Sequence, residues 1–312
     1  MKRIVYYIAY GFWFVLSLLP FCVLYVLSDI IYYILRYVVR YRRHVIRKNL
    51  SRSFPEKSKH ELRRIEKGFY HYFSDYLVES VKLLTISERQ MRKRMTFTGT
   101  ELLNQTAADG QSIAVYLGHY GNWEWMSSLP YWVSDKIQCT QIYHPLEDIY
   151  FDQLFKRIRE RHGAVGIKMN ETLRRIAEYR KQKQVIIVGY LSDQVPMWTN
   201  MHHWLTFLNQ DTPVLTGAER IIKASGHAAF YGDIRRLRRG YYNCEFKLIT
   251  REPQQTGEWE ITDSYFRELE KTIRREPQYW LWSHNRWKRT REEFNRRFME
   301  VDGRIVKRET NE

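Results

Sequence analysis

The chain has 312 residues, enough for one full hydrophobic core, and we expect one catalytic body with an appendage instead of two equal domains. Its 51 lysines and arginines against 35 aspartates and glutamates give a formal net charge of +16, which indicates an anionic partner such as phospholipid headgroups, a phosphorylated glycolipid, an acidic carrier protein or nucleic acid. Three distant cysteines and the adjacent His202 and His203 lack metal-ligand spacing, so we expect neither a disulfide framework nor a metal site.

Aromatic residues make up 15% of the chain, including 10 tryptophans and 23 tyrosines. Such amphipathic rings settle at the headgroup depth of a membrane, although stacking on nucleic acid uses the same residues. The sequence contains no helix-turn-helix, zinc-finger or aromatic ribonucleoprotein motif, so we expect a membrane partner and no nucleic acid.

The N-terminal segment predicts a membrane anchor. Residues 4–27 carry no charge, and the stretch is long enough to cross a bilayer even though it contains Pro20. A small-x-small cleavage signal is missing at its end, which favours an anchor over a signal peptide. Six basic and no acidic residues follow in 36–48, so the main body is expected to face the cytoplasm. A helix lying flat on the membrane would use the same basic cluster, and both arrangements remain open.

Beyond the anchor, the pattern alternates between helices and strands. Ser58 and Glu61 fit a capping box that starts an amphipathic helix over 58–85. We further predict helices at 99–108, 122–133, 149–162, 171–181, 212–225 and 262–275, and strands at 112–117, 138–143, 185–190, 228–234 and 241–250, the last two forming a hairpin.

This order predicts an α/β fold with a mixed, mostly parallel sheet flanked by helices, preceded by the N-terminal membrane-anchoring helix. We assign residues 1–45 to the anchor and its basic juxtamembrane segment, 46–290 to the catalytic domain and 291–312 to a charged C-terminal tail. Active sites in such sheets lie beyond the carboxyl ends of the strands, which is where His119 and Asp193 fall.

His119 and Glu124 stand five residues apart on the turn that leaves the predicted strand 112–117. A hydroxyl nucleophile must lose a proton as it attacks, and a neutral imidazole held by a carboxylate can accept that proton near neutral pH. We therefore expect His119 to be a general base and Glu124 to orient its ring. A surface histidine followed by a helix-start glutamate would show the same spacing.

Several short motifs occur together in one order. They are Asn49-Leu50, Phe54-Pro55-Glu56, the segment 118–124 that reads Gly-His-Tyr-Gly-Asn-Trp-Glu, the segment 159–163 that reads Arg-Glu-Arg-His-Gly, Asp193-Gln194, and the tryptophan-rich segment 277–288. With the N-terminal anchor, they make most of the chain similar to the late acyltransferases of lipid A biosynthesis, the lauroyl and myristoyl transferase type within the lysophospholipid acyltransferase family.

The resemblance implies a membrane-bound O-acyltransferase of the inner membrane that moves a fatty acyl chain from acyl carrier protein to a hydroxyl of a lipid A precursor or related anionic lipid. It needs no cofactor, and the chain has no Gly-x-Ser-x-Gly elbow for a serine nucleophile. The family pattern implies that Arg159 meets the acceptor phosphate or the oxyanion and that Asp193 orders that arginine or the sugar. The substrate-binding residues expected in total are Arg159, Asp193, Gln194, Asn122, Arg286 and Lys288.

Residues 198–209 have no clear match in the enterobacterial transferases, which leaves the acceptor and the chain length open. The acceptor could instead be a lysophospholipid, an amino-acid lipid or a glycosylated phosphoinositide, and coenzyme A could replace the carrier protein as donor. A non-catalytic basic protein that binds a membrane surface or nucleic acid is the alternative from another functional class.

Overall fold

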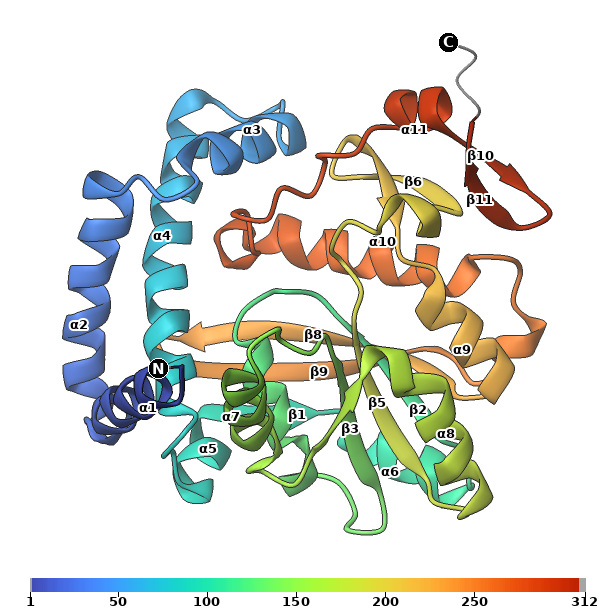
Figure 1. Cartoon of the computed structure of the whole chain (residues 1–312), viewed down its shortest axis with the longest axis horizontal. Helices are drawn as coiled ribbons and strands as arrows, with labels where there is room; N and C mark the ends of the chain where they lie inside the picture. The colour runs from blue at the N-terminus through green and yellow to red at the C-terminus, as the bar shows by residue number, and fades with distance from the viewer. Residues whose placement is uncertain (1, 309–312) are drawn as a thin grey trace.

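The computed structural model of the chain describes residues 2–308, with side chains from residue 6 onward; Met1 and tail residues 309–312 lie outside this range. A seven-stranded sheet forms its centre, in the order β1-β9-β8-β2-β5-β3-β4 (Figure 1). The strands are β1 (Met95–Thr98), β2 (Ile113–Leu117), β3 (Gln138–Tyr143), β4 (Val165–Lys168), β5 (Ile186–Leu191), β8 (Ala228–Arg238) and β9 (Tyr241–Thr250).

All neighbouring strands of this sheet are parallel except β8 and β9, which form the expected antiparallel hairpin. The predicted mixed, mostly parallel α/β sheet is thereby confirmed. The central strand β2 is buried at every position, since its run of Ile113 to Leu117 has no polar face. The surrounding helices are α3 (Arg43–Ser53), α4 (Lys59–Lys82), α5 (Glu88–Arg94), α6 (Thr100–Ala108), α7 (Ile149–Glu160), α8 (Thr172–Lys181), α9 (Gly217–Ser225) and α10 (Glu260–Arg275).

Helix α4 begins where its capping box predicts. The Ser58 hydroxyl accepts from the Glu61 backbone N–H, and the Glu61 carboxylate accepts from the Ser58 backbone N–H. Its buried positions include Phe69 and Tyr72, whose hydroxyl donates to the Gly121 carbonyl. Helix α4 therefore supports the turn that carries His119.

The N-terminal anchor differs from its predicted extent. Pro20 separates α1 (Lys2–Leu18) from α2 (Phe21–Tyr33), because a proline ring removes a backbone donor and clashes with the preceding turn. A π-helical turn, Ile34–Val38, extends α2. Within residues 2–308, the apolar helix long enough to cross a membrane is consequently Phe21–Val38, and not 4–27.

The predicted helix over 212–225 is wrong in its first part. Residues Gln210–Val214 form strand β7, which pairs antiparallel with β6 (His203–Phe207), and α9 starts only at Gly217. Pro213 suits the first turn of a helix as well as a short edge strand, so its presence did not separate the two. Beyond Lys288, α11 (Arg291–Arg297) and the hairpin of β10 (Phe298–Val301) and β11 (Arg304–Lys307) form a small separate cluster at the C-terminal end (Figure 1).

Candidate active site

His119 and Asp193 meet at the carboxyl ends of neighbouring strands. His119 follows β2 and Asp193 follows β5, and the two strands are parallel partners. The His119 backbone N–H donates to Asp193 Oδ2 at 2.9 Å, and His119 Nδ1 lies 2.6 Å from Asp193 Oδ1. Gly118 leaves room for Leu269 of α10, since a Cβ there would stand 2.6 Å from Leu269 Cδ1, whereas its distance of 3.5 Å from the Asp193 carboxylate is an ordinary contact.

The contact with Asp193 determines which ring nitrogen of His119 is available. A neutral imidazole that donates its Nδ1–H to the carboxylate keeps an acceptor lone pair on Nε2. Nε2 lies 3.2 Å from the side-chain nitrogen of Gln194, and the His119 side chain is 16% exposed. The Gln194 amide therefore occupies Nε2, and a hydroxyl that enters the cavity has to take its place to reach this nitrogen.

Asp193 is buried and held by three donors. Besides the two groups of His119, the Trp280 indole N–H donates to Oδ2 at 2.8 Å. Burial alone would raise the pKa of Asp193, but the neighbouring His119 and these hydrogen bonds outweigh it and lower the pKa to about 2. The residue is thus a fixed carboxylate at neutral pH, suited to stabilise an imidazolium beside it.

Glu124 has a different partner from the one that the sequence analysis assigns. Its two carboxylate oxygens accept from Nε and Nη2 of Arg159, both at 3.0 Å, in a bidentate ion pair. The predicted contact from Glu124 to the His119 ring is wrong, since Asp193 makes that contact. Likewise Asp193 does not order Arg159; Glu124 does. Burial by itself would lower the pKa of Arg159, but Glu124 raises it overall.

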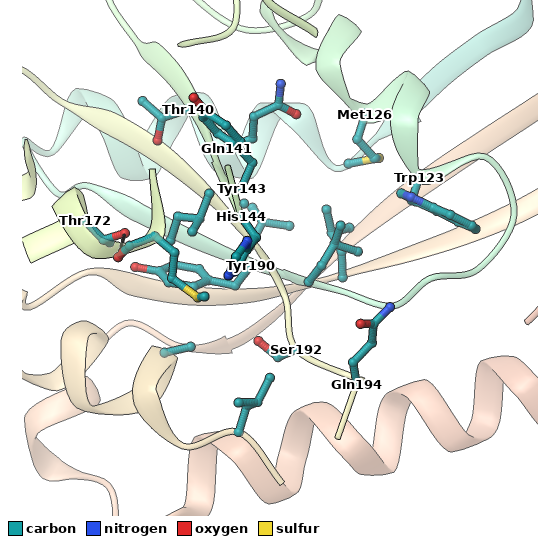
Figure 2. A pocket seen from close by; sticks show the side chains of 18 of the residues that line it. Trp123, Met126, Thr140, Gln141, Tyr143, His144, Thr172, Tyr190, Ser192 and Gln194 are labelled. Atoms are coloured by element: carbon teal, nitrogen blue, oxygen red, sulfur yellow. Dashed lines mark hydrogen bonds between the residues drawn. The ribbon is translucent and has the colours of Figure 1, made fainter. Parts of the chain in front are cut away.

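A cavity of about 880 Å³ adjoins the His119–Asp193 pair and the Glu124–Arg159 pair. His119, Glu124, Arg159 and Gln194 belong to its polar part, and most of its remaining lining is apolar. Trp123 and Gln194 lie at one end of the cavity and Thr172 at the other (Figure 2). The apolar lining comes mainly from β2, β3, β5, the 3₁₀ helix over Trp123–Tyr131, and α9, and includes Val115, Leu117, Met126, Leu129, Cys139, Ile187, Gly189, Ala218 and Ile221. A volume of this size is typical of sites for extended small-molecule ligands.

Large apolar side chains also form the exposed rim of the cavity. They line it and are exposed to solvent, although burial of such side chains is normally favourable; they are Leu146, Met169, Leu173 and Met197. They follow β3, β4 and β5 at the carboxyl edge of the sheet. An apolar slot with an apolar rim and a polar end is the shape that a fatty acyl ester or thioester requires.

Three of the predicted substrate-binding residues lie elsewhere. Asn122 is buried, donates from Nδ2 to Glu79 Oε2 at 2.7 Å and caps the following 3₁₀ helix by accepting from the Trp125 N–H. Arg286 is fully buried and donates to the Pro213 carbonyl. Lys288 is exposed but does not line the cavity. The positions of Asn122 and Arg286 make them structural supports.

Trp280 belongs to the tryptophan-rich segment 277–288, and the sequence analysis gave this residue no role in the site. A short antiparallel bridge joins Tyr120 to Trp280, the His119 carbonyl accepts from the Leu281 N–H, and the Tyr279 carbonyl accepts from the Gly121 N–H. The tryptophan-rich segment therefore fixes the backbone of the histidine turn. In the sequence, the only indication of this role was that the segments 118–124 and 277–288 occur among the same set of motifs.

Among residues 2–308, no group of three or more histidine, cysteine, aspartate or glutamate side chains is arranged to hold a metal ion. The family model described as bacterial lipid A biosynthesis acyltransferase matches residues 1–289. A comparison with curated proteins finds no match to the chain.

Proposed function

The chain belongs to the bacterial lipid A biosynthesis acyltransferase family, and from this and the site geometry we propose that it moves a fatty acyl chain from acyl carrier protein to a hydroxyl of a lipid A precursor. His119 acts as the general base and Asp193 as its carboxylate partner. The observation that carries the proposal is the 2.6 Å contact from His119 Nδ1 to Asp193 beside a large apolar cavity.

The reaction follows from the orientation of the ring. Nε2 of His119 accepts the proton of the acceptor hydroxyl while its oxygen attacks the thioester carbonyl carbon. A carbon–oxygen bond forms, the carbon–sulfur bond breaks, and the proton passes from the imidazolium to the leaving thiolate. Asp193 stabilises the imidazolium between these steps, as the acidic member of a catalytic triad does.

Two groups in the cavity are suited to the negative charge of the reaction. The Gln194 side-chain amide lies 3.2 Å from the nitrogen that takes the proton, which places it within reach of the developing oxyanion. Glu124 occupies Nε and Nη2 of Arg159 and leaves Nη1 for an anionic group of the acceptor. Glu124 thereby positions the arginine and does not touch the proton.

We further propose that the enzyme works at the cytoplasmic face of the inner membrane. The exposed Arg40, Arg42, Arg47 and Lys48 follow the apolar N-terminal helix and suit an anionic leaflet. The net charge of +16 suits both an anionic lipid acceptor and an acidic carrier protein.

The test is acyl transfer by the purified, detergent-solubilised chain. Labelled acyl chains are supplied on acyl carrier protein or on coenzyme A, and the acceptors are a lipid A precursor, a lysophospholipid, an amino-acid lipid and a glycosylated phosphoinositide. We expect transfer to the lipid A precursor, and a loss of about 100- to 10,000-fold in His119→Ala. The exposed His60 on α4 provides the control His60→Ala. Equal transfer by His119→Ala and wild type would refute the catalytic assignment.

A further inference from the structure

Helix α2 has two faces of opposite character. Its inner face carries Tyr25, Ser28 and Tyr32, at helical spacing, and lies along α4 (Figure 1). The Tyr25 hydroxyl donates to Glu79 Oε1 at 3.0 Å, and the Ser28 hydroxyl donates to Asp75 Oδ1 at 2.6 Å. Polar contacts therefore fasten α2 to the body of the protein over most of its length.

An arginine from the central sheet's hairpin loop strengthens this attachment. Arg239 donates to Asp29 of α2 at 2.6 Å and to Asp75 of α4 at 2.7 Å. Farther along the helix, the Tyr32 ring stacks on the His71 ring with centroids 3.5 Å apart. Before the helix begins, the Lys82 ammonium donates to the carbonyls of residues 17 and 19.

This attachment is incompatible with a helix that crosses the bilayer. A spanning helix lies within hydrocarbon about 30 Å thick, so α4 beside it would carry Glu79, and Asp75 with its arginine partners, to the same depth. Charged groups at the bilayer centre are costly, and the sheet behind α4 would have to enter the membrane as well.

The outer face of α2 is suited to a membrane surface instead. Val23, Val26, Ile30, Ile34 and Val38 recur every three or four residues, and each is exposed by 40% or more. Exposed basic side chains follow directly, namely Arg40, Arg42, Arg47 and Lys48. An apolar stripe that ends in cations matches the acyl layer and anionic headgroups of one leaflet.

Helix α1 connects this surface to the active site. Its exposed residues include Ile8, Phe12 and Val15, while Trp13 packs edge-to-face on Phe155 of α7 at 5.3 Å. Phe155 and Arg159, both on α7, line the cavity. The helix that bears the lipid-facing residues is thus one packing layer from the cavity wall.

We propose that the chain is monotopic, with α2 lying in the plane of an anionic phospholipid leaflet and its outer face immersed to the level of the first acyl carbons. A lipid acceptor then reaches the cavity sideways from the same leaflet, past α1 and α7. The membrane arrangement does not depend on which hydroxyl is acylated, so its test is separate from that of the reaction.

Depth measurements distinguish lying from spanning. One sample carries a nitroxide label on native Cys22, which lies on the exposed side of α2. Three further samples have Cys22→Ser and carry the label on a new cysteine, introduced by Val26→Cys, Ile30→Cys or Val38→Cys. The full chain is bound to vesicles of phosphatidylethanolamine and phosphatidylglycerol. We expect every label at a similar depth of roughly 5–10 Å. A depth that rises to about 15 Å near Ile30 and falls toward both ends shows a spanning helix and overturns the proposal.

Two further measurements complete the test. In spheroplasts, a membrane-impermeant maleimide added outside should leave Cys22 unmodified, whereas modification from outside shows that α2 crosses the membrane. In vesicle flotation, Ile30→Glu should bind at least 10-fold more weakly than Leu102→Glu, a matched control on α6 away from α2 (Figure 1). Equal binding of the two variants would exclude α2 as the membrane face, while transfer to detergent-dispersed acceptor reports on the reaction independently.

Discussion

Asp193 lies beside His119 because each stands two residues beyond a register pair of neighbouring parallel strands. Leu117 at the end of β2 is opposite Leu191 at the end of β5. The chain continues in step from both strands, so the carboxylate reaches both the backbone N–H and the ring of the histidine. The register of the sheet therefore pairs His119, the proposed proton acceptor, with Asp193, whereas Glu124 on the same turn pairs with Arg159.

The indole N–H of Trp280 should contribute to catalysis through Asp193. Trp280→Phe removes a donor to a buried carboxylate, which costs about 1.5–3 kcal/mol for a hydrogen bond to a charged group. We expect roughly a 10- to 100-fold fall in kcat with little change in KM. Trp282→Phe is the control, because its indole N–H donates to the Pro277 carbonyl and to neither His119 nor Asp193. Steady-state kinetics on both variants would reveal a structural role if they lost activity equally.

Arg159 should act mainly on substrate affinity. Arg159→Ala removes the cation that lines the cavity, so KM for an anionic acceptor should rise about 10- to 100-fold. This factor corresponds to the free energy of one charge-assisted hydrogen bond, about 1.5–3 kcal/mol. Arg159→Lys keeps the charge but loses the bidentate geometry with Glu124 and should be intermediate. Kinetics with variable acceptor concentration measure this. A fall in kcat at unchanged KM would instead place Arg159 in the chemical step.

Gly189 should limit how long an acyl chain the cavity accepts. It lies on β5 beside Val115, four residues before Asp193, or about 13 Å along an extended chain. A Cβ there would make only ordinary contacts, the nearest at 3.7 Å to the Thr140 carbonyl, so a side chain fits but occupies the cavity.

In the series Gly189, Gly189→Ala and Gly189→Leu, the preferred donor should therefore become progressively shorter. The leucine variant should lose at least 10-fold in kcat/KM with the wild type's longest donor while retaining activity with short ones. Mass spectrometry of the acylated products gives the chain length. An unchanged length distribution in Gly189→Leu would show that the acyl chain does not pass this position.

Glu79 should make stability depend on pH. Burial raises its pKa to about 7, against the opposing effect of Arg236, whereas the ordinary value is 4.5. Between those values the unfolded state binds fewer protons than the folded state, so this residue's contribution to stability falls as the pH rises from 4.5 to 7. Glutamine does not titrate, so Glu79→Gln lacks this decrease in stability with rising pH.

The free energy of unfolding of Glu79→Gln, relative to wild type, should therefore increase across this pH interval. Urea denaturation at several pH values measures it, and taking the difference cancels the other titrating groups. A relative stability that decreases with pH would show that the carboxylate is ionised in the fold throughout.

The sequence predicted the main sheet because its strands are apolar runs bounded by turns, as in Ile113–Leu117. It did not predict β1 or β4, which are four residues long and depend on pairing with β9 and β3. Strand β7 was assigned to a helix because its hairpin with β6 is a tertiary contact. The prediction of one continuous anchor over 4–27 was wrong because Pro20 ends the first helix and starts a second one.

Within the site, sequence reasoning found His119, Asp193, Arg159 and Glu124 but paired them incorrectly. Proximity in sequence favoured His119 with Glu124. The true pairs depend on which strands are neighbours and on where α7 packs, and single-sequence patterns report neither. Asn122 and Arg286 are polar residues with buried supporting roles, which composition does not distinguish from binding roles.

The most direct test of the account compares Asp193→Asn with Glu124→Gln in single-turnover acyl transfer at saturating substrate. Asp193→Asn should slow the chemical step about 100- to 10,000-fold even at saturation, because an amide cannot stabilise the imidazolium. Glu124→Gln should lose affinity through Arg159 and recover most of its rate at saturation. A near-normal rate in Asp193→Asn together with a large, unrecoverable loss in Glu124→Gln would contradict the account.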